Sequence, residues 1–197
     1  MDIGFIPALA AFALVSSITP GPNNLMLMAS GANFGFRRTL PHMFGVAMGF
    51  TFMLVLVGAG LSEVFDRYPI SYTILKAFSV VYLLWLAWKI ANAAPPKSAK
   101  AEGRPFSFLQ AAGFQWVNPK AWAMSLTAFT VYAPSQSLGA TFAVAAVFGL
   151  VNLPSIASWT VLGQELRRLL KSPRHLRAFN ITMAALLVAS LYPLLLT

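Results

Sequence analysis

The sequence predicts an all-α membrane protein with six transmembrane helices, arranged as a 3+3 inverted repeat in which a proline motif breaks the first helix of each half. Two observations place the chain in a membrane. Of its 197 residues, 58% are hydrophobic and only 10% are charged, whereas soluble domains carry about 25% charged residues. Residues 3–36 and 121–164 also contain no charged side chain. A third observation, the position of the basic residues, predicts how the helices are oriented.

The apolar runs divide the chain into spans of about 20 residues, the length that crosses a bilayer. The uncharged run 121–164 is long enough for two spans, and the turn-forming residues around Pro134 mark the division. We therefore expect six spans, the first of them interrupted in the middle. They lie at 4–34, 39–61, 70–91, 107–132, 137–162 and 178–196.

Lysine and arginine residues collect on the cytoplasmic side of membrane proteins. With six spans, eleven of the fourteen basic residues lie in the first, third and fifth connections: Arg37, Arg38, Lys89, Lys97, Lys100, Arg104, Arg167, Arg168, Lys171, Arg174 and Arg177. The opposite side carries only Arg67, while Lys76 and Lys120 lie within spans. This distribution predicts that both termini face away from the cytoplasm.

We expect a single transmembrane domain over residues 1–197, composed of two pseudo-halves at 1–92 and 106–197. The residues between them, 93–105, are rich in proline, small and charged residues, which is typical of a flexible linker, here on the cytoplasmic side. Three spans in each half would give related halves opposite orientations in the membrane. Such inverted repeats are common in membrane carriers.

Helix-breaking and polar residues interrupt the first span: Thr19, Pro20, Gly21, Pro22, Asn23 and Asn24. Each proline removes a backbone donor, so carbonyl groups one turn earlier lose their partners. In hydrocarbon such groups are costly unless protein, water or a ligand satisfies them. The sequence therefore predicts that this interruption lines a polar binding cavity, and a simple proline kink is the alternative.

Asn118, Pro119 and Lys120 interrupt the fourth span at a similar depth. Lys120 lies near the middle of the membrane, where a lysine costs roughly 2.5 to 3.5 kcal/mol. Because the sequence puts no acidic residue at that depth, we expect Lys120 to bind the carboxylate of a substrate, with a structural ion pair as the alternative. Lys76 lies near the outer end of its span, where its side chain can reach water, and it is given no role.

Other residues within the spans each have two interpretations. Asn152 and Pro154 form a further polar interruption in the fifth span, which either lines the same pathway or only kinks the helix. Gly45 and Gly49 allow close helix packing, between the two halves in the preferred interpretation and in a homodimer in the alternative. His42 either faces lipid headgroups, which is preferred, or carries a proton.

Composition and motifs argue against several functional classes. The net charge of +9 could suit nucleic acid, but the basic residues fall between apolar runs instead of along one face. The chain has no cysteine and no motif for a metal, a cofactor or a catalytic nucleophile, so we expect neither an enzyme nor a bound cofactor. An anion or small-solute channel is an alternative function because Lys120 would suit it, although channels usually use rings of polar groups.

Four motifs together resemble the lysine-exporter (LysE) superfamily, in particular its RhtB-like branch: TPGPNN, GFRRT, VVYLLWLAWKI and FQWVNPKAW. They cover nearly the whole chain in this order, and their pattern is closest to exporters of cysteine and O-acetylserine. The resemblance implies a multi-pass protein of the bacterial inner membrane, surrounded by lipid, where the distribution of basic residues would put both termini in the periplasm. It also implies export of small neutral amino acids or derivatives, driven by the proton motive force. The family's motifs fall on residues 19–23 and 118–120.

The resulting hypothesis is alternating access, in which one half rocks against the other and exposes a central site to each side in turn. Lys120 and the helix ends would bind the carboxylate of the substrate, while Asn23, Asn24 and backbone carbonyl groups would bind its ammonium group. Protons are the expected coupling partner. With no acidic residue at membrane depth, one hypothesis is that Lys120 itself exchanges the proton.

Overall fold

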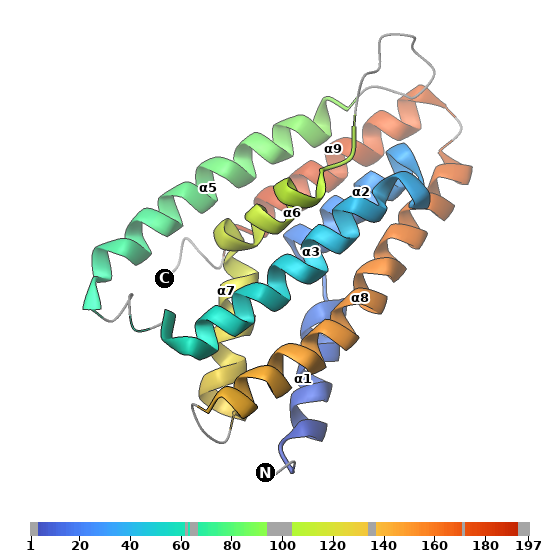
Figure 1. The fold of residues 1–197 in the computed structure, drawn as a ribbon. Coiled ribbons are helices and arrows are strands. Elements are labelled where there is room, and N and C mark those ends of the chain that lie inside the picture. Colours follow the sequence, from blue (N-terminus) through green and yellow to red (C-terminus); the bar gives the residue numbers. More distant parts are fainter. Residues whose placement is uncertain are drawn as a thin grey trace.

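The computed structural model describes residues 4–61, 63, 67–93, 104–133, 137–170 and 172–192, and every regular element in these ranges is a helix (Figure 1). The elements in chain order are α1 (Ile6–Ile18), α2 (Pro22–Phe34), α3 (Phe36–Leu56), η1 (Val57–Leu61), α5 (Pro69–Ala91), α6 (Phe108–Phe114), η2 (Gln115–Val117), α7 (Pro119–Thr127), η3 (Ala128–Tyr132), α8 (Leu138–Leu169) and α9 (Pro173–Ala189). The predicted helical class is therefore confirmed. Most of the predicted linker 93–105 lies outside the described residues.

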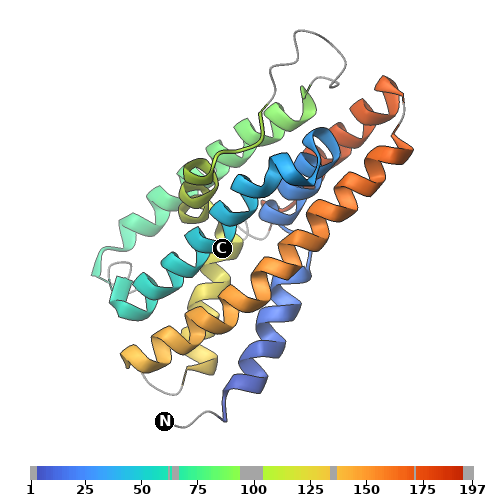
Figure 2. The ribbon, with the colours of Figure 1, turned by 45° about the vertical axis from the view of Figure 1, so that its right-hand side comes forward.

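Among the described residues, three helical segments are long and apolar enough to cross a membrane, judged by length and composition. They are Phe36–Leu61, Pro69–Ala91 and Leu138–Leu169. The shorter apolar helix α1 is followed end to end by α2, so that the two together run along much of the bundle (Figures 1 and 2). Gly35 alone joins α2 to α3, and its φ of 80° belongs to the left-handed region that favours glycine.

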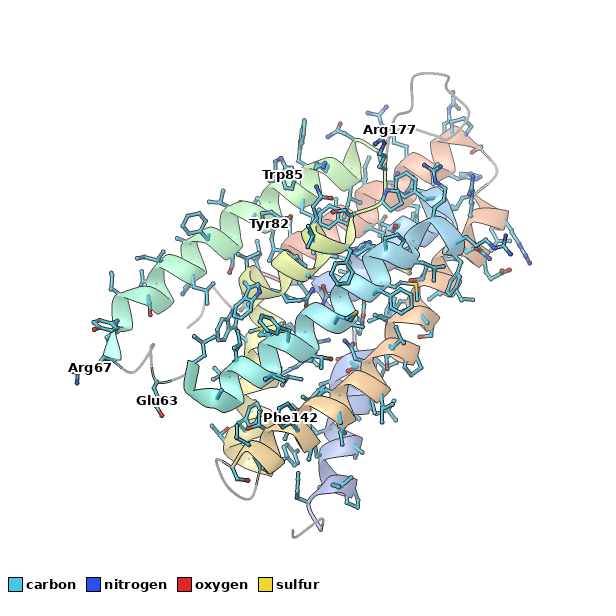
Figure 3. The ribbon with its side chains drawn as sticks, viewed as in Figure 1. Glu63, Arg67, Tyr82, Trp85, Phe142 and Arg177 are labelled. Carbon is cyan, nitrogen blue, oxygen red and sulfur yellow. The ribbon has the colours of Figure 1, made fainter. Side chains whose placement is uncertain are left out.

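The basic residues gather at one end of the bundle. The last turns of α2, α5 and α8 and the first turns of α3 and α9 meet there (Figures 1 and 2). Among described residues, this end carries Arg37, Arg38, Lys89, Arg104, Arg167, Arg168, Arg174 and Arg177. Figure 3 shows Arg177 at this end, and Glu63 and Arg67 at the opposite one.

Small residues bring helices of the two halves into close contact. A Cβ atom on Gly31 would lie 2.2 Å from the carbonyl oxygen of Thr160, and one on Gly163 would lie 2.0 Å from that of Met28. These contacts press α2 against α8. A Cβ atom on Gly45 would likewise lie 2.3 Å from the carbonyl oxygen of Phe108, on α6.

Gly49 continues the same contact, because a Cβ atom there would lie 2.5 Å from the Cα atom of Ala112. The preferred interpretation of Gly45 and Gly49, packing between the two halves, is therefore confirmed. The other main contacts join α1 and α3 to α8, and α5 to α9.

Two residues within the spans can now be placed, and the expectation for one of them, His42, is wrong. Pro154 does not end the helix, since α8 is continuous from Leu138 to Leu169, and Asn152 lines a small cavity together with residues of α1, α2 and α7. One proline removes a single donor, and the remaining bonds keep the helix together. His42 does not face headgroups, because only 2% of it is exposed and its ring packs 5.3 Å from that of Phe106.

The fifth connection is also shorter than expected. Its arginine-rich residues belong largely to helices, because α8 extends to Leu169 and α9 begins at Pro173. Ser172 caps α9 by accepting a hydrogen bond from the backbone nitrogen of His175.

Gly163→Ala should destabilise the protein, because the new methyl group would overlap the carbonyl oxygen of Met28. Overpacking of this kind typically costs about 1–3 kcal/mol. The melting temperature in detergent, followed by tryptophan fluorescence, should fall. Gly113→Ala is the matched control, since a Cβ atom there meets no heavy atom within 4 Å. Equal melting temperatures for the two variants would show that α2 and α8 are not so closely packed.

Candidate substrate site at two interrupted helices

The first interruption is a short extended segment between α1 and α2. Helix α1 ends at Ile18, Thr19 is extended with φ −65° and ψ 146°, and Gly21 is nearly fully extended with φ −177° and ψ 176°. Helix α2 then begins at Pro22, which suits the first position of a helix because it needs no backbone donor. The last carbonyl groups of α1 therefore require partners from outside their own helix.

Side chains from α2 and α8 supply some of these partners. The Nδ2 atom of Asn24 donates to the carbonyl oxygens of Ser17 and Thr19, both at 2.8 Å. The Nε1 atom of Trp159 donates to the carbonyl oxygen of Ile18 at 3.0 Å. The carboxyl end of α1 is thus stabilised by side chains of α2, which follows it, and of α8, which packs against it.

Lys120 supplies the remaining partners from α7. Its Nζ atom donates to the carbonyl oxygen of Thr19 at 2.7 Å, to the hydroxyl oxygen of Thr19 at 2.9 Å and to the carbonyl oxygen of Pro20 at 3.3 Å. An ammonium group has three hydrogens, so these contacts use its full donor capacity. The negative end of the α1 dipole also favours a cation here.

Gly21 makes this position of Lys120 possible. A Cβ atom on Gly21 would lie 2.6 Å from Cδ and 3.1 Å from Nζ of the lysine. The absence of a side chain therefore lets the lysine stem lie directly against the backbone of the first interruption.

The second interruption lies between α6 and α7. The 3-10 turn Gln115–Val117 follows α6, and Asn118 is extended with φ −93° and ψ 107°. Its side chain accepts a hydrogen bond of 3.1 Å from the backbone nitrogen of Lys120 and so caps α7, which begins at Pro119. The Nε1 atom of Trp122 donates to the carbonyl oxygen of Trp116 at 2.9 Å.

A pair of side-chain amides joins the two interruptions. The Nδ2 atom of Asn23 donates to the Oε1 atom of Gln115 at 2.8 Å, and the Nε2 atom of Gln115 donates to the Oδ1 atom of Asn23 at 3.1 Å. Gln115 is fully buried and also donates to the carbonyl oxygen of Ala111. The two broken helices are therefore held together by this pair and by Lys120.

A small cavity of about 20 Å³ lies where the two interruptions meet. It is lined by Ser16, Ser17, Gly21, Asn23, Asn24, Phe50, Asn118, Lys120, Ala121, Met124 and Asn152. The volume is enough for about one water molecule. The buried hydroxyl of Ser17 has no hydrogen-bond partner, so a water molecule there would satisfy it.

The structure brings most of the predicted site residues to this cavity, but not all of them. Thr19 and Pro20 are exposed on its outer side and contact Lys120 through oxygen atoms. Pro20, Pro22 and Pro119 line a neighbouring cavity of about 660 Å³ between α5 and α7, which shares Gly21 with the small one. Lys120 and Lys76 line this larger cavity as well, although the sequence gives Lys76 no role.

The sequence does not predict a role at this site for three residues, Gln115, Trp159 and Ser17. Gln115 lies in the same motif as Asn118, Pro119 and Lys120, which the sequence predicts as site residues. A glutamine in an apolar span also indicates a polar contact. Trp159 resembles an ordinary apolar residue of α8. Ser17 is one of two serines in α1, and its burial depends on how α1 packs.

Apolar helices of spanning length and two polar interruptions enclosed between them define a membrane translocator. The chain matches the LysE type translocator family over residues 14–191 and belongs to it. The resemblance drawn from the four motifs is therefore confirmed.

Named relatives cover nearly the whole chain. The cysteine/O-acetylserine efflux proteins of Escherichia coli (strain K12) and Shigella sonnei (strain Ss046) are 30% identical over 188 residues, which is 93% of each chain. The protein of the same name from Escherichia coli O139:H28 is 29% identical over the same length. No solved structure matches the chain.

Replacing Asn23 or Gln115 by leucine should leave the other amide without its partner. The loss of unfolding free energy in the double variant should therefore be smaller than the sum of the two single losses. The difference should be roughly 0.6 to 1.7 kcal/mol, as for hydrogen bonds between membrane helices. The free energy of unfolding in mixed micelles measures this coupling.

The control is a second double-mutant cycle, which combines Asn23→Leu with Ser79→Ala. The hydroxyl of Ser79 bonds only within α5, to the carbonyl oxygen of Leu75, so these two effects should add. Additive effects in the Asn23 and Gln115 cycle would mean that the amide pair does not hold the two interruptions together.

Proposed function

We propose that the chain is a secondary-active exporter that moves small neutral amino acids or their derivatives from the cytoplasm to the periplasm by alternating access, driven by the proton motive force. The substrates would be of the cysteine/O-acetylserine or homoserine/threonine type. The observation that carries the proposal is the meeting of two interrupted helices around Lys120 and a polar cavity. The names of the relatives supply the substrate class.

The membrane arrangement that fits best has six spans. They are α1 with α2, α3 with η1, α5, α6 through η3, α8, and α9. Contacts support an inverted repeat of halves 1–92 and 106–197: α1 packs on α8 as α6 packs on α3, and α5 packs on α9. The basic end would face the cytoplasm, which puts both termini in the periplasm.

Within this arrangement, the amino end of α2 is the preferred place for the substrate carboxylate. Helix α2 has no side-chain cap, whereas α7 is capped by Asn118. Uncapped backbone donors and the helix dipole attract an anion. Lys120 would bind the same carboxylate after leaving Thr19, and Asn23, Asn24 and Asn152 would bind the ammonium group.

The small central cavity cannot hold a substrate by itself, although Gly21 and Lys120 also line the neighbouring cavity of about 660 Å³. A volume of about 20 Å³ is far below that of ligand pockets, which are about 300 to 1,000 Å³. In the arrangement described, Lys120 contacts the segment after α1 instead of a substrate. Rocking of the halves would separate these contacts and admit the substrate from one side at a time.

Lys120→Met should reduce uptake of radiolabelled amino acids into inside-out vesicles by at least about tenfold, because a charge-assisted hydrogen bond contributes roughly 1.5–3 kcal/mol. The panel includes cysteine, O-acetylserine, homoserine and threonine. Lys76→Met, the matched loss of a membrane lysine, should retain uptake. The melting temperature reports whether each variant is folded. Full uptake by folded Lys120→Met would exclude the carboxylate role, and single-channel currents would favour a channel.

Proton coupling is tested by removing the pH gradient while the membrane potential is kept constant. Uptake into inside-out vesicles should then fall, because a proton must move against each exported substrate. An uptake rate that does not respond to the pH gradient would contradict the proposed coupling and the hypothesis that Lys120 exchanges the proton.

A further inference from the structure

A second polar cavity lies toward the basic end of the bundle. Its volume is about 600 Å³, within the range of small-molecule sites. Residues of α2, α3, α5 and α6, together with those just before α6, form its walls, among them Asn33, His42, Lys89, Arg104, Phe106 and Gln110. It shares no lining residue with the small central cavity.

The charge of this basic-end cavity is positive. Lys89 and Arg104 line it, and none of its described lining residues is acidic. Among the described residues, the ion pair is the one on α8 that joins Arg168 to Glu165, and neither of these residues lines the cavity. The Nζ atom of Lys89 instead lies 4.5 Å from the centre of the Trp85 ring. Two cations without a carboxylate partner favour an anionic group on a ligand.

A buried and unsatisfied side chain lies in the same wall. Only 2% of His42 is exposed, and neither ring nitrogen has a hydrogen-bond partner among the residues that the structure describes. A buried polar atom without a partner is unfavourable, and a ligand that bonds to it removes the penalty. Phe106 lies against both His42 and Lys89, with its ring centre 5.3 Å from the imidazole and 5.9 Å from Nζ. Movement of this one ring would therefore uncover the imidazole next to the lysine.

Helix α2 connects this cavity to the two interruptions. Met26, Ala29 and Asn33 line the basic-end cavity, whereas Asn23 and Asn24 line the central one. At 1.5 Å per residue, Asn23 and Met26 are only about 4.5 Å apart along the helix axis. A small solute that leaves one cavity is then close to the other.

We propose that the basic-end cavity is a second, cytoplasm-side binding site for the exported amino acid, which it occupies before it reaches the interrupted helices. Lys89 and Arg104 bind its carboxylate, and His42 hydrogen-bonds its polar groups when Phe106 moves aside. The inference rests on the proposed function, because it takes the same substrate class and the same direction of transport.

The absence of cysteine from the chain permits a direct test. Ala29→Cys puts one thiol in the wall of the basic-end cavity, and His175→Cys puts one on the exposed start of α9 at the same end. Inside-out vesicles expose this end to a membrane-impermeant maleimide. Both thiols should react, and O-acetylserine should slow the reaction of the first only. Failure of the Ala29→Cys thiol to react would overturn the proposal.

Second substitutions in the Ala29→Cys protein identify the contacts. Lys89→Gln should raise the O-acetylserine concentration that gives half-protection by about tenfold or more, as expected for loss of a charge-assisted bond. His42→Phe should raise it as well, while it keeps a ring against Phe106. Arg174→Gln, an exposed basic residue of α9 outside the cavity, is the matched control and should have no effect. Equal half-protection in all variants would overturn the proposal.

Uptake of O-acetylserine by the same vesicles separates the two proposals. Uptake without protection of Ala29→Cys would overturn the second site and leave the exporter intact. Protection without uptake would support the site and contradict export. Absence of both would overturn both proposals.

Discussion

The structure depends on how the carboxyl end of α1 is satisfied in a non-aqueous surrounding. Two prolines remove the donors that would continue the helix, and hydrocarbon supplies none in their place. Asn24, Trp159 and Lys120 donate to the carbonyl oxygens that are left. Because these three side chains come from α2, α8 and α7, satisfying one helix end requires the two halves to pack together.

The same requirement explains why the two interruptions lie side by side. Lys120 reaches the first interruption from the first turn of α7, and that turn begins where Asn118 ends the second interruption. The reciprocal amides of Asn23 and Gln115 add a bond between the two. Each broken helix therefore supplies polar groups that the other needs.

The helical class and the family could be predicted from the sequence because both depend on local signals. Apolar length predicts helices, and proline, glycine and asparagine act on their own backbone. The partners of Ile18 and Asn23 could not be predicted, since Trp159 and Gln115 are 141 and 92 residues away along the chain. A local signal can also predict too much. Pro154 suggests a helix break, but one proline without glycine or an adjacent asparagine leaves α8 continuous.

In the exporter proposed above, the hydrogen bonds from Lys120 to Thr19 would have a consequence for release of the transported molecule. Any carboxylate that binds the ammonium group competes with oxygen atoms that the protein carries permanently at the same place. This internal competition would weaken the apparent affinity, because the dissociation constant is divided by the fraction of molecules in which the lysine is free. In the proposed carrier cycle, Thr19 would also give the lysine a partner as soon as the substrate departs, so that no unpaired charge would remain in the membrane.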